Sequence, residues 1–272
     1  ASALQLALGF WWDSIRRTRT LEEKKLQAYL EQLREFSSRK TLTLREMQQV
    51  GGRMQRAMMT LPRGAMCFMA ALFALMRGLS FPWQKRRTSR ALRADFRVVA
   101  DLLQVNCGRG FFAFDHMERA APVYTDASKE SRYAGGGYFS LCGRYRWWTY
   151  GSGARNQPID FLEGDAVLLA ALDLAHLWAG KVVPMYIDNR SFQLSAVKGW
   201  SKAERLYQQL RSLFMVALRH EIVFEFHWIS THDNIFADAL SRTSGERIFK
   251  QLVFRDQPLL AGCKLERHAS SG

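Results

Sequence analysis

The chain has 272 residues, of which 48% are hydrophobic, and it carries a formal net charge of +14. This apolar content is enough for one large or two small packed domains, so the composition excludes a disordered chain. Residues 1–97 hold 19 Lys and Arg against 7 Asp and Glu, whereas residues 98–272 hold 20 against 18. The asymmetry predicts a polyanion-binding module joined to a nearly neutral one; a solvated basic surface without a partner is the alternative.

The cysteines and the apolar runs bear on the compartment and on membranes. The four cysteines are scattered, without a CxxC pair or a His at zinc-site spacing, which is typical of reduced thiols in an intracellular protein of the cytoplasm or nucleus. The longest apolar run, residues 65–76, is too short to cross a bilayer and no signal peptide is visible, so we expect no membrane partner. Because the sequence starts without Met inside an apolar run, we expect it to be a segment of a longer protein.

Helices are predicted in the first third of the chain. Residues 21–36 carry a broad amphipathic stripe, and TLRE at residues 43–46 has the Thr and Glu spacing of a capping box that begins a second helix. That helix ends before Pro62 and Gly64, and a third helix follows over about residues 65–77. Exposed arginines of this segment are candidates for nucleic-acid contacts, namely Arg53, Arg56 and Arg63.

A basic linker, residues 81–97, passes into a further helix, and the glycines of NCGRGFF mark a turn after it. Three successive cations of the linker, Lys85, Arg86 and Arg87, suggest a nuclear-localisation signal or a phosphate-binding cluster. A solvated linker is the alternative.

The pattern changes to β-strands from Val123. Strands are predicted over 123–128, 134–140 and 142–150, in an antiparallel arrangement. Three glycines, residues 135–137, fall inside a strand, where glycine weakens pairing. Either a nucleic-acid backbone or a neighbouring strand approaches closely there, or the glycines serve a bulge or tight sheet packing.

Helices and strands then alternate. Helices are predicted over about 159–179, 191–199, 201–220 and 234–242, and strands over 182–188 and 222–229. Strands alternating with helices after a meander predict an α/β fold, a mixed sheet with flanking helices. The remaining residues, 243–272, have weak periodicity and are expected to form a tail or connector.

Acidic residues stand at the edges of these elements. Asp126 and Asp188 are expected at the carboxyl ends of strands, where open α/β sheets place their sites, and Glu163 lies on the sheet-facing side of a helix. The last helix and its preceding loop offer Asp233 and Asp238. An acid at the rim of a buried face is unusual unless a cation neutralises it. Several converging carboxylates are what a two-metal phosphodiester hydrolase needs to hold a pair of divalent cations. The helix of Glu163 carries three competing acids, Asp160, Asp165 and Asp173.

These acids and their surroundings resemble the ribonuclease H domain of retroelement reverse transcriptases, most closely the DIRS-like and gypsy-like ones. The resemblance rests on PVYTDAS at 122–128, on E-x-x-A at Glu163 and Ala166, and on HDNIFADALSR at 232–242. It implies a ribonuclease H-like fold, with Asp233 as a loop acid and Asn234 as a helix N-cap. The resemblance implies that four acids are both catalytic residues and metal ligands: Asp126, Glu163, Asp188 and Asp238.

The first segment has a likeness of its own. LGFWWDS, EEKKLQAYLEQL and the stretch LTLREMQQVGGRMQRAMMTLPRGAMCFMAAL resemble the end of a reverse transcriptase palm followed by its thumb. In that family the thumb is a helical bundle that grips the template-primer, which implies template-primer nucleic acid and an upstream polymerase domain of the same polyprotein as partners. No Y-x-D-D polymerase motif occurs in the chain, so we expect no DNA polymerisation from it alone.

The resemblance also implies a cofactor and a substrate. Two Mg²⁺ ions, for which Mn²⁺ substitutes, would activate water and stabilise the leaving 3′ oxygen in the RNA strand of an RNA–DNA hybrid. Contacts to 2′-hydroxyls would select that strand. Integrases and transposases of related fold end their acid series in Glu, so the order Asp, Glu, Asp, Asp favours a ribonuclease H over a DNA-cutting nuclease.

Some residues depart from the family pattern. Ser230 and Thr231 stand where retroelements commonly show a Pro-Gly pair. His227 and His232 are both candidates for a histidine that assists turnover, and an ordinary loop histidine is the alternative for each. His232 and Lys198 are also candidates for nucleic-acid contacts, although Lys198 is equally explained as a surface lysine.

The predicted domains are the end of a palm with a helical thumb-like domain (1–80), a basic linker with a connecting helix (81–118), a ribonuclease H-like domain (119–243) and a tail or connector (244–272). The predicted function is metal-dependent hydrolysis of the RNA strand of RNA–DNA hybrids. The alternative is a catalytically inactive or domesticated remnant that binds nucleic acid.

Overall fold

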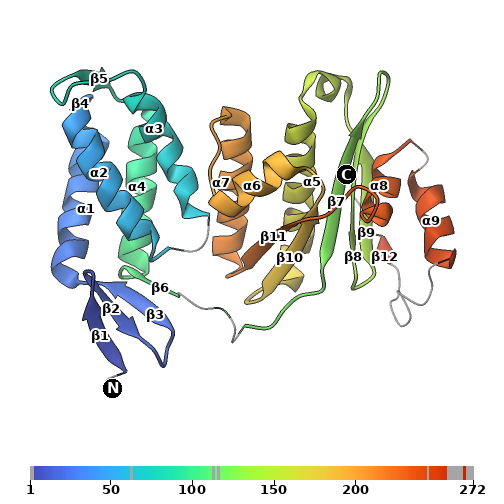
Figure 1. Ribbon diagram of the computed structural model, residues 1–272, viewed down its shortest axis with the longest axis horizontal. Coiled ribbons are helices and arrows are strands. Elements are labelled where there is room, and N and C mark those ends of the chain that lie inside the picture. Colours follow the sequence, from blue (N-terminus) through green and yellow to red (C-terminus); the bar gives the residue numbers. More distant parts are fainter. Residues whose placement is uncertain are drawn as a thin grey trace. The chain divides into compact units, whose positions relative to one another are not determined.

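A computed structural model of the chain describes residues 3–61, 64–111, 114, 117–243, 245–255 and 266–267. The chain forms two compact units, one of residues 1–116 with 199–202 and the other of residues 117–198 with 203–272 (Figure 1). The predicted module boundaries near residues 80, 118 and 243 stay predictions. In the described part of the chain, no helix is both long and apolar enough to cross a membrane.

The first unit combines small antiparallel sheets with helices. Its strands are β1 (Leu4–Ala7), β2 (Phe10–Asp13), β3 (Thr18–Leu21), β4 (Thr41–Thr43), β5 (Lys85–Arg87) and β6 (Arg109–Phe111). Its helices are α1 (Glu23–Ser38), α2 (Leu44–Met58), α3 (Ala70–Met76) and α4 (Arg90–Val105). One sheet has the order β1-β2-β3-β6, and β4 pairs with β5. The predicted third helix begins with a 3-10 turn, Ala65–Met69, and the predicted linker contains β5 and the start of α4.

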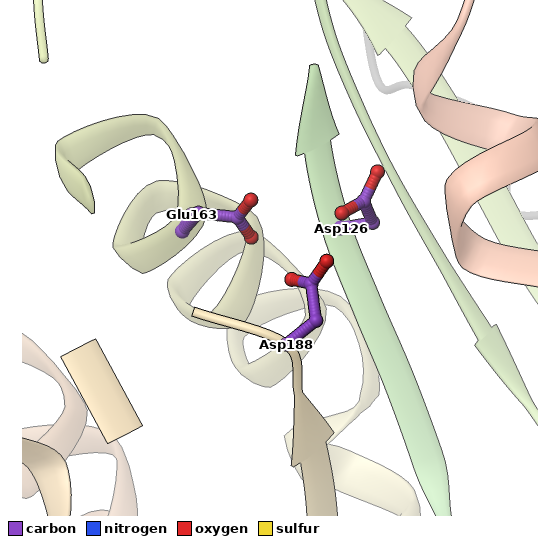
Figure 2. Close-up of side chains that lie close together, drawn as sticks. All are labelled: Asp126, Glu163 and Asp188. Carbon is purple, nitrogen blue, oxygen red and sulfur yellow. The ribbon is translucent and has the colours of Figure 1, made fainter. Parts of the chain in front are cut away.

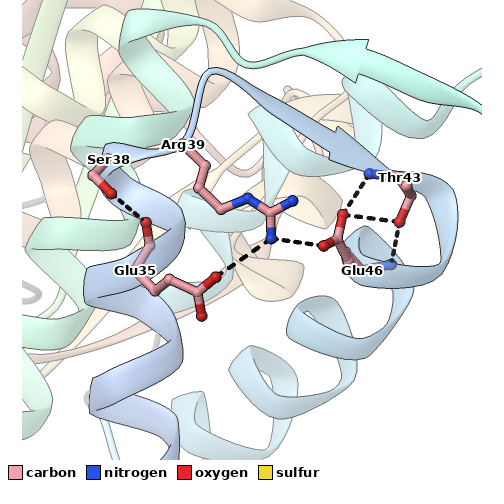
Figure 3. Close-up of polar contacts among 5 residues, drawn as sticks. All are labelled: Glu35, Ser38, Arg39, Thr43 and Glu46. Atoms are coloured by element: carbon pink, nitrogen blue, oxygen red, sulfur yellow. Dashed lines mark hydrogen bonds and ion pairs between the residues drawn. The ribbon is translucent and has the colours of Figure 1, made fainter.

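Helix α2 begins with the predicted capping box. The Thr43 hydroxyl accepts a hydrogen bond from the Glu46 backbone N–H (3.2 Å), and Glu46 Oε2 accepts one from the Thr43 backbone N–H (2.7 Å) (Figure 3). The other oxygen, Oε1, accepts from Arg39 Nη1 at 2.6 Å. Since Arg39 directly follows α1, one glutamate both satisfies the first turn of α2 and ties it to the end of α1.

The second unit is built on a six-stranded mixed sheet. Its strands are β7 (Val123–Lys129), β8 (Ala134–Ser140), β9 (Arg144–Thr149), β10 (Val182–Ile187), β11 (Val223–Trp228) and β12 (Glu266–Arg267), in the order β11-β10-β7-β8-β9-β12. Strands β7, β8 and β9 are antiparallel, whereas β10 runs parallel to both β7 and β11. The helices are α5 (Ile159–Leu174), α6 (Arg190–Lys198), α7 (Glu204–Arg219), α8 (Ile235–Ser241) and α9 (Gly245–Arg255), with 3-10 turns at Ser152–Asn156 and Ala175–Leu177. The α/β fold is the predicted one.

Helices cover both faces of this sheet (Figure 1). Ala134 of β8 packs with Leu162 of α5, whereas Phe139, five residues further along the strand, packs with Leu240 of α8 and Phe249 of α9. An odd separation along a strand places side chains on opposite faces. Helix α9 lies within residues 244–272, the segment predicted as a tail or connector, and its Phe249 and Val253 are part of the core of the unit.

The space beside the strand glycines, residues 135–137, is filled by side chains and a helix rather than by a ligand. A Cβ on Gly137 would lie 2.5 Å from Leu240 Cβ, and one on Gly136 would lie 2.6 Å from the indole of Trp148. Gly135 meets the Ser241 carbonyl of α8 in the same way. Tight packing therefore explains these three glycines, and α8 rests almost directly on the backbone of β8.

Candidate metal centre

Asp126 is the fourth residue of β7 and is 4% exposed. The prediction that it ends its strand is wrong. The strand continues to Lys129 because Ala127, Ser128 and Lys129 remain paired with β8. Asp126 therefore stands in the middle of the sheet, where the backbone on both sides of it is held by ladder hydrogen bonds.

Asp188 directly follows β10, as predicted. Strands β10 and β7 are parallel, and Ile187 pairs with Thr125. Asp188 follows Ile187 and Asp126 follows Thr125, so the two acids lie beside each other at the same level of the sheet. Asp188 Oδ2 accepts a hydrogen bond from the Thr231 hydroxyl at 3.0 Å, and its backbone carbonyl accepts one from Trp228 Nε1 at 2.9 Å. The loop that carries Ser230 and Thr231 thus orients this carboxylate.

Glu163 supplies the third carboxylate from α5 and is 4% exposed. Figure 2 shows Glu163, Asp126 and Asp188 directed toward one another from the helix and from two neighbouring strands. Each contributes an oxygen that lies within 4.8 Å of the others. Three acids far apart in the sequence, Asp126, Glu163 and Asp188, thus form one cluster, the acid cluster.

The competing acids of α5 have partners elsewhere. Asp173 accepts two hydrogen bonds from Arg146 Nη1, at 2.8 and 3.0 Å. Asp165 bonds the hydroxyl of Tyr150, and Asp160 lies 3.7 Å from Arg205 Nη2.

Burial and mutual repulsion disfavour the charged forms of the acid cluster. Burial and, second, the charge of Asp188 raise the pKa of Asp126 to about 7. Burial and the charges of Asp126 and Asp188 raise the pKa of Glu163 well above its usual range. The pKa of Asp188 is also raised by burial, although the bond from Thr231 opposes this. Like-charged groups in a buried site cost free energy unless protons or cations neutralise them.

The acid cluster fits a divalent cation. Glu163 Oε2 and Asp188 Oδ1 are buried and have no hydrogen-bond partner among the described residues. Buried polar atoms are nearly always satisfied, and carboxylate oxygens are the ligands that hard cations such as Mg²⁺ and Mn²⁺ prefer. A bound cation would satisfy both atoms and offset the repulsion.

Asp238 is the predicted acid that does not join the acid cluster. It lies on α8, and Arg242 one turn later holds its carboxylate through two hydrogen bonds, from Nε at 2.9 Å and from Nη2 at 2.5 Å. Its charge nevertheless raises the pKa of Asp126. The fourth acid is therefore close enough to act on the acid cluster but is paired with a cation of its own chain.

Asn234 precedes α8 as predicted, but its side chain does not cap the helix. It is 1% exposed, and Nδ2 donates to the carbonyl of Thr125 at 3.0 Å. The buried Nδ2 donor needs a partner, and the strand carbonyl next to Asp126 provides it. The Ser128 hydroxyl donates to the Ser241 carbonyl at 2.6 Å. Two hydrogen bonds thus fasten both ends of α8 to β7.

The sequence-based predictions give no supporting role at the site to three residues, namely Arg242, Asn234 and Thr231. Only Arg242 had a local signal, since an Asp and an Arg four residues apart on a helix are neighbours.

The remaining predicted residues lie outside the acid cluster. His232 and Lys198 are exposed, and the ring of His227 stacks on Tyr186 with centroids 5.1 Å apart. Asp233 accepts a hydrogen bond from the Ser230 hydroxyl at 2.6 Å and is a loop acid. In the first unit, Arg53 lies over the ring of Tyr29, and Arg56 donates to the carbonyl of Leu8 at 2.5 Å. Arg63 lies outside the described residues.

Comparison with known proteins finds similar solved structures. Ribonuclease H1 of the halophilic archaeon Halobacterium salinarum NRC-1 is 15% identical, with a TM-score of 0.40, over 47% of this chain and 98% of the archaeal one. The N-terminal ribonuclease H domain of a Mycobacterium tuberculosis protein is 14% identical, with a TM-score of 0.35, over 49% of this chain and 99% of that one.

A foamy viral protease-reverse transcriptase in complex with an RNA/DNA hybrid is 12% identical, with a TM-score of 0.31, and covers 84% of this chain. This chain spans 29% of the viral one. No protein-family model and no curated protein matches the sequence. The chain itself has an α/β fold, in which helices flank a mixed sheet.

Proposed function

We propose that the second unit is a metal-dependent endonuclease that hydrolyses the RNA strand of RNA–DNA hybrids. The observation that carries the proposal is the convergence of Asp126, Glu163 and Asp188, from β7, α5 and the end of β10, within 4.8 Å. Two buried acids and a half-buried one, all with raised pKa values, have no evident structural purpose together, and perturbed acids concentrate at functional sites.

Asp126, Glu163 and Asp188 are the residues that would hold Mg²⁺ or Mn²⁺, and Asp238 would join them on release from Arg242. A pair of bound cations supplies a water-derived nucleophile and neutralises charge on the phosphate. In this hydrolysis the water oxygen would form a bond to phosphorus as the bond to the 3′ oxygen breaks. The water would give up one proton and the leaving oxygen would take one up, which leaves a 5′-phosphate and a 3′-hydroxyl. The chain itself contributes by positioning its ligands. The register between β7 and β10 and the hydrogen bond from Thr231 orient the carboxylates of Asp126 and Asp188 before the substrate binds.

The wider context belongs to the same proposal. We infer that the chain is part of a retroelement reverse transcriptase, DIRS-like or gypsy-like, in which the first unit corresponds to the thumb and connection. Template-primer nucleic acid and an upstream polymerase domain of the same polyprotein would be its partners, and Arg53, Arg56, Arg63, Lys198 and His232 its nucleic-acid contacts. The basic excess of residues 1–97 supports this assignment.

The test is cleavage of a labelled RNA annealed to DNA, in Mg²⁺, in Mn²⁺ and in chelator, beside single-stranded RNA and duplex DNA. The proposal expects metal-dependent cleavage of the hybridised RNA alone. Asp188→Asn is expected to abolish cleavage while hybrid affinity is retained, and Asp173→Asn, whose carboxylate pairs with Arg146, serves as the matched control. Equal cleavage by wild type and Asp188→Asn would remove the assigned role.

The ion pair between Asp238 and Arg242 favours a second candidate, a remnant that binds nucleic acid without cutting it. In such a remnant the fourth acid would be permanently occupied by its arginine. Hybrid binding without cleavage, in wild type and in Arg242→Gln alike, would favour this candidate over the nuclease.

A further inference from the structure

An aromatic pair stands exposed on the first unit. Phe81 and Trp83, in the loop before β5, are 52% and 70% exposed. Their rings stack, with centroids 5.0 Å apart and planes inclined by 15°. The stack covers one face of each ring, and the exposure of Trp83 leaves its other face open to water. Large aromatic surfaces in solvent mark interaction sites.

The loop that carries this pair is tied down. Gln84 Oε1 accepts hydrogen bonds from the backbone N–H groups of Ser80 and Phe81, at 2.7 and 2.9 Å. The backbone N–H of Arg45, in the first turn of α2, donates to the carbonyl of Pro82 at 3.1 Å. Because the backbone is held at both points, the pair is in place before a ligand binds, and less conformational entropy is lost on binding.

Exposed cations without an acidic partner among the described residues follow the aromatic pair in the chain or lie next to the strand paired with β5. All side chains of β5 are exposed, and β5 pairs with β4, which lies between two further exposed cations. None of these cations forms an ion pair with an acid of the described part of the chain, whereas the neighbouring Arg39 bonds Glu35 and Glu46. The cations are Lys40, Arg45, Lys85, Arg86 and Arg87.

We propose that these cations and the ring pair Phe81–Trp83, together called the ring platform, bind an unpaired stretch of RNA or DNA. A base would extend the stack on the open face of Trp83, and the flanking phosphates would lie on the cations. An unpaired strand fits better than a duplex, whose base faces are covered by their neighbours. An acidic peptide would match the positive charge of the cations, but it does not carry a flat ring beside each of its negative charges, as a nucleic-acid strand does.

This inference stands apart from the proposed nuclease, because the ring platform uses no residue of the acid cluster. The binding test is therefore made in chelator, where no metal-dependent cleavage occurs. The probe is a short labelled oligothymidylate, and the readout is fluorescence anisotropy. Phe81→Leu/Trp83→Leu is expected to weaken binding by roughly 5- to 100-fold, the loss of one stacked base. Trp11→Leu, which removes an exposed tryptophan of β2, is the matched control and is expected to bind as wild type.

A strand of the same length with abasic sites separates stacking from charge. Wild type is expected to bind the abasic strand more weakly than oligothymidylate. Phe81→Leu/Trp83→Leu is expected to bind the abasic strand as tightly as wild type does. If the double substitution weakened binding of both strands equally, the proposal would be overturned, because the two rings would then contribute to binding without stacking on bases.

The cations are tested by the salt dependence of binding. Lys85→Gln/Arg87→Gln is expected to reduce the slope of log K against log salt by about 1.4, at roughly 0.7 per phosphate of a single strand. Lys24→Gln/Arg97→Gln makes the same charge change at exposed positions of α1 and α4 and is expected to leave the slope unchanged. Equal competition by polyglutamate or by a duplex with closed ends would overturn the proposal. Oligouridylate beside oligothymidylate shows whether RNA, DNA or both are bound.

Discussion

Arg242 holds both carboxylate oxygens of Asp238, at 2.5 and 2.9 Å, one helical turn along α8. Asp238 is near enough for its charge to raise the pKa of Asp126. Arg242 thus pairs with the carboxylate of Asp238, which would otherwise be the fourth acid of the acid cluster. This makes Arg242 a competitor of a divalent cation for Asp238.

Replacing Arg242 by Gln should therefore strengthen metal binding. We expect the affinity for Mn²⁺, measured by isothermal titration calorimetry, to rise by roughly 5- to 30-fold, because a charged hydrogen bond contributes about 1–2 kcal/mol at a half-exposed position. Arg219→Gln removes the same charge from the last turn of α7 and is the control. Unchanged or weaker binding in Arg242→Gln would show that Arg242 does not compete with the metal.

The raised pKa of Asp126 makes stability depend on pH. The folded state binds this proton more tightly than the unfolded chain does, since its pKa is about 7 against the ordinary 3.8. The resulting stabilisation is complete below the unfolded value and is lost as the pH rises through about 7. The melting temperature of the metal-free second unit is thus expected to fall between about pH 5 and about pH 8, and added Mg²⁺ to restore it.

Asp126→Asn tests the source of this dependence by calorimetry. The variant is expected to melt higher than wild type at the alkaline end, without metal, and to show a flatter profile. Asp101→Asn, at an exposed position of α4, is the control. A wild-type profile that rises with pH would contradict the assignment.

The hydroxyl of Thr231 is expected to matter for metal affinity. Its bond to Asp188 Oδ2 opposes the upward shift of the Asp188 pKa that burial causes. Thr231→Val removes the bond that orients Asp188 Oδ2 and favours its charged form, so Mn²⁺ affinity should fall roughly 10-fold. Thr231→Ser keeps a hydroxyl and should retain most of the affinity. A loss in Thr231→Ser as large as that in Thr231→Val would contradict this role of the hydroxyl, because serine keeps it.

Gly137 should not tolerate a methyl group. A Cβ there would lie 2.5 Å from Leu240 Cβ and 3.1 Å from the Leu240 carbonyl carbon, so α8 would have to move. We expect Gly137→Ala to lower the free energy of unfolding by about 1–3 kcal/mol, measured in urea. Gly153→Ala, whose Cβ would meet nothing within 4 Å, is the matched control. If Gly137→Ala lowered the free energy of unfolding no more than the control does, α8 would be able to shift at little cost in free energy.

Local patterns were sufficient for much of the fold. The Thr43 and Glu46 spacing predicts the capping box because both partners lie within one turn, and the strand of Asp188 ends where the sequence predicts. Helix α9 was not predicted, although its apolar residues Ile248, Phe249, Leu252 and Val253 recur at helical spacing. Its packing against Phe139 and Tyr145, about a hundred residues away in sequence, was not predictable from a local pattern. The same is true of Asn234, whose side-chain amide donates to a strand instead of capping its own helix.

By itself, the sequence determined the α/β class, the basic first third and the acids carried by separate elements, because composition, periodicity and order are properties of the chain alone. Only the tertiary structure decided which acids meet. The β7–β10 register sets Asp126 beside Asp188, α5 brings Glu163 to them, and α8 leaves Asp238 with its arginine. Such choices depend on strand pairing and on packing between residues distant in sequence, and no local pattern encodes the distances between them.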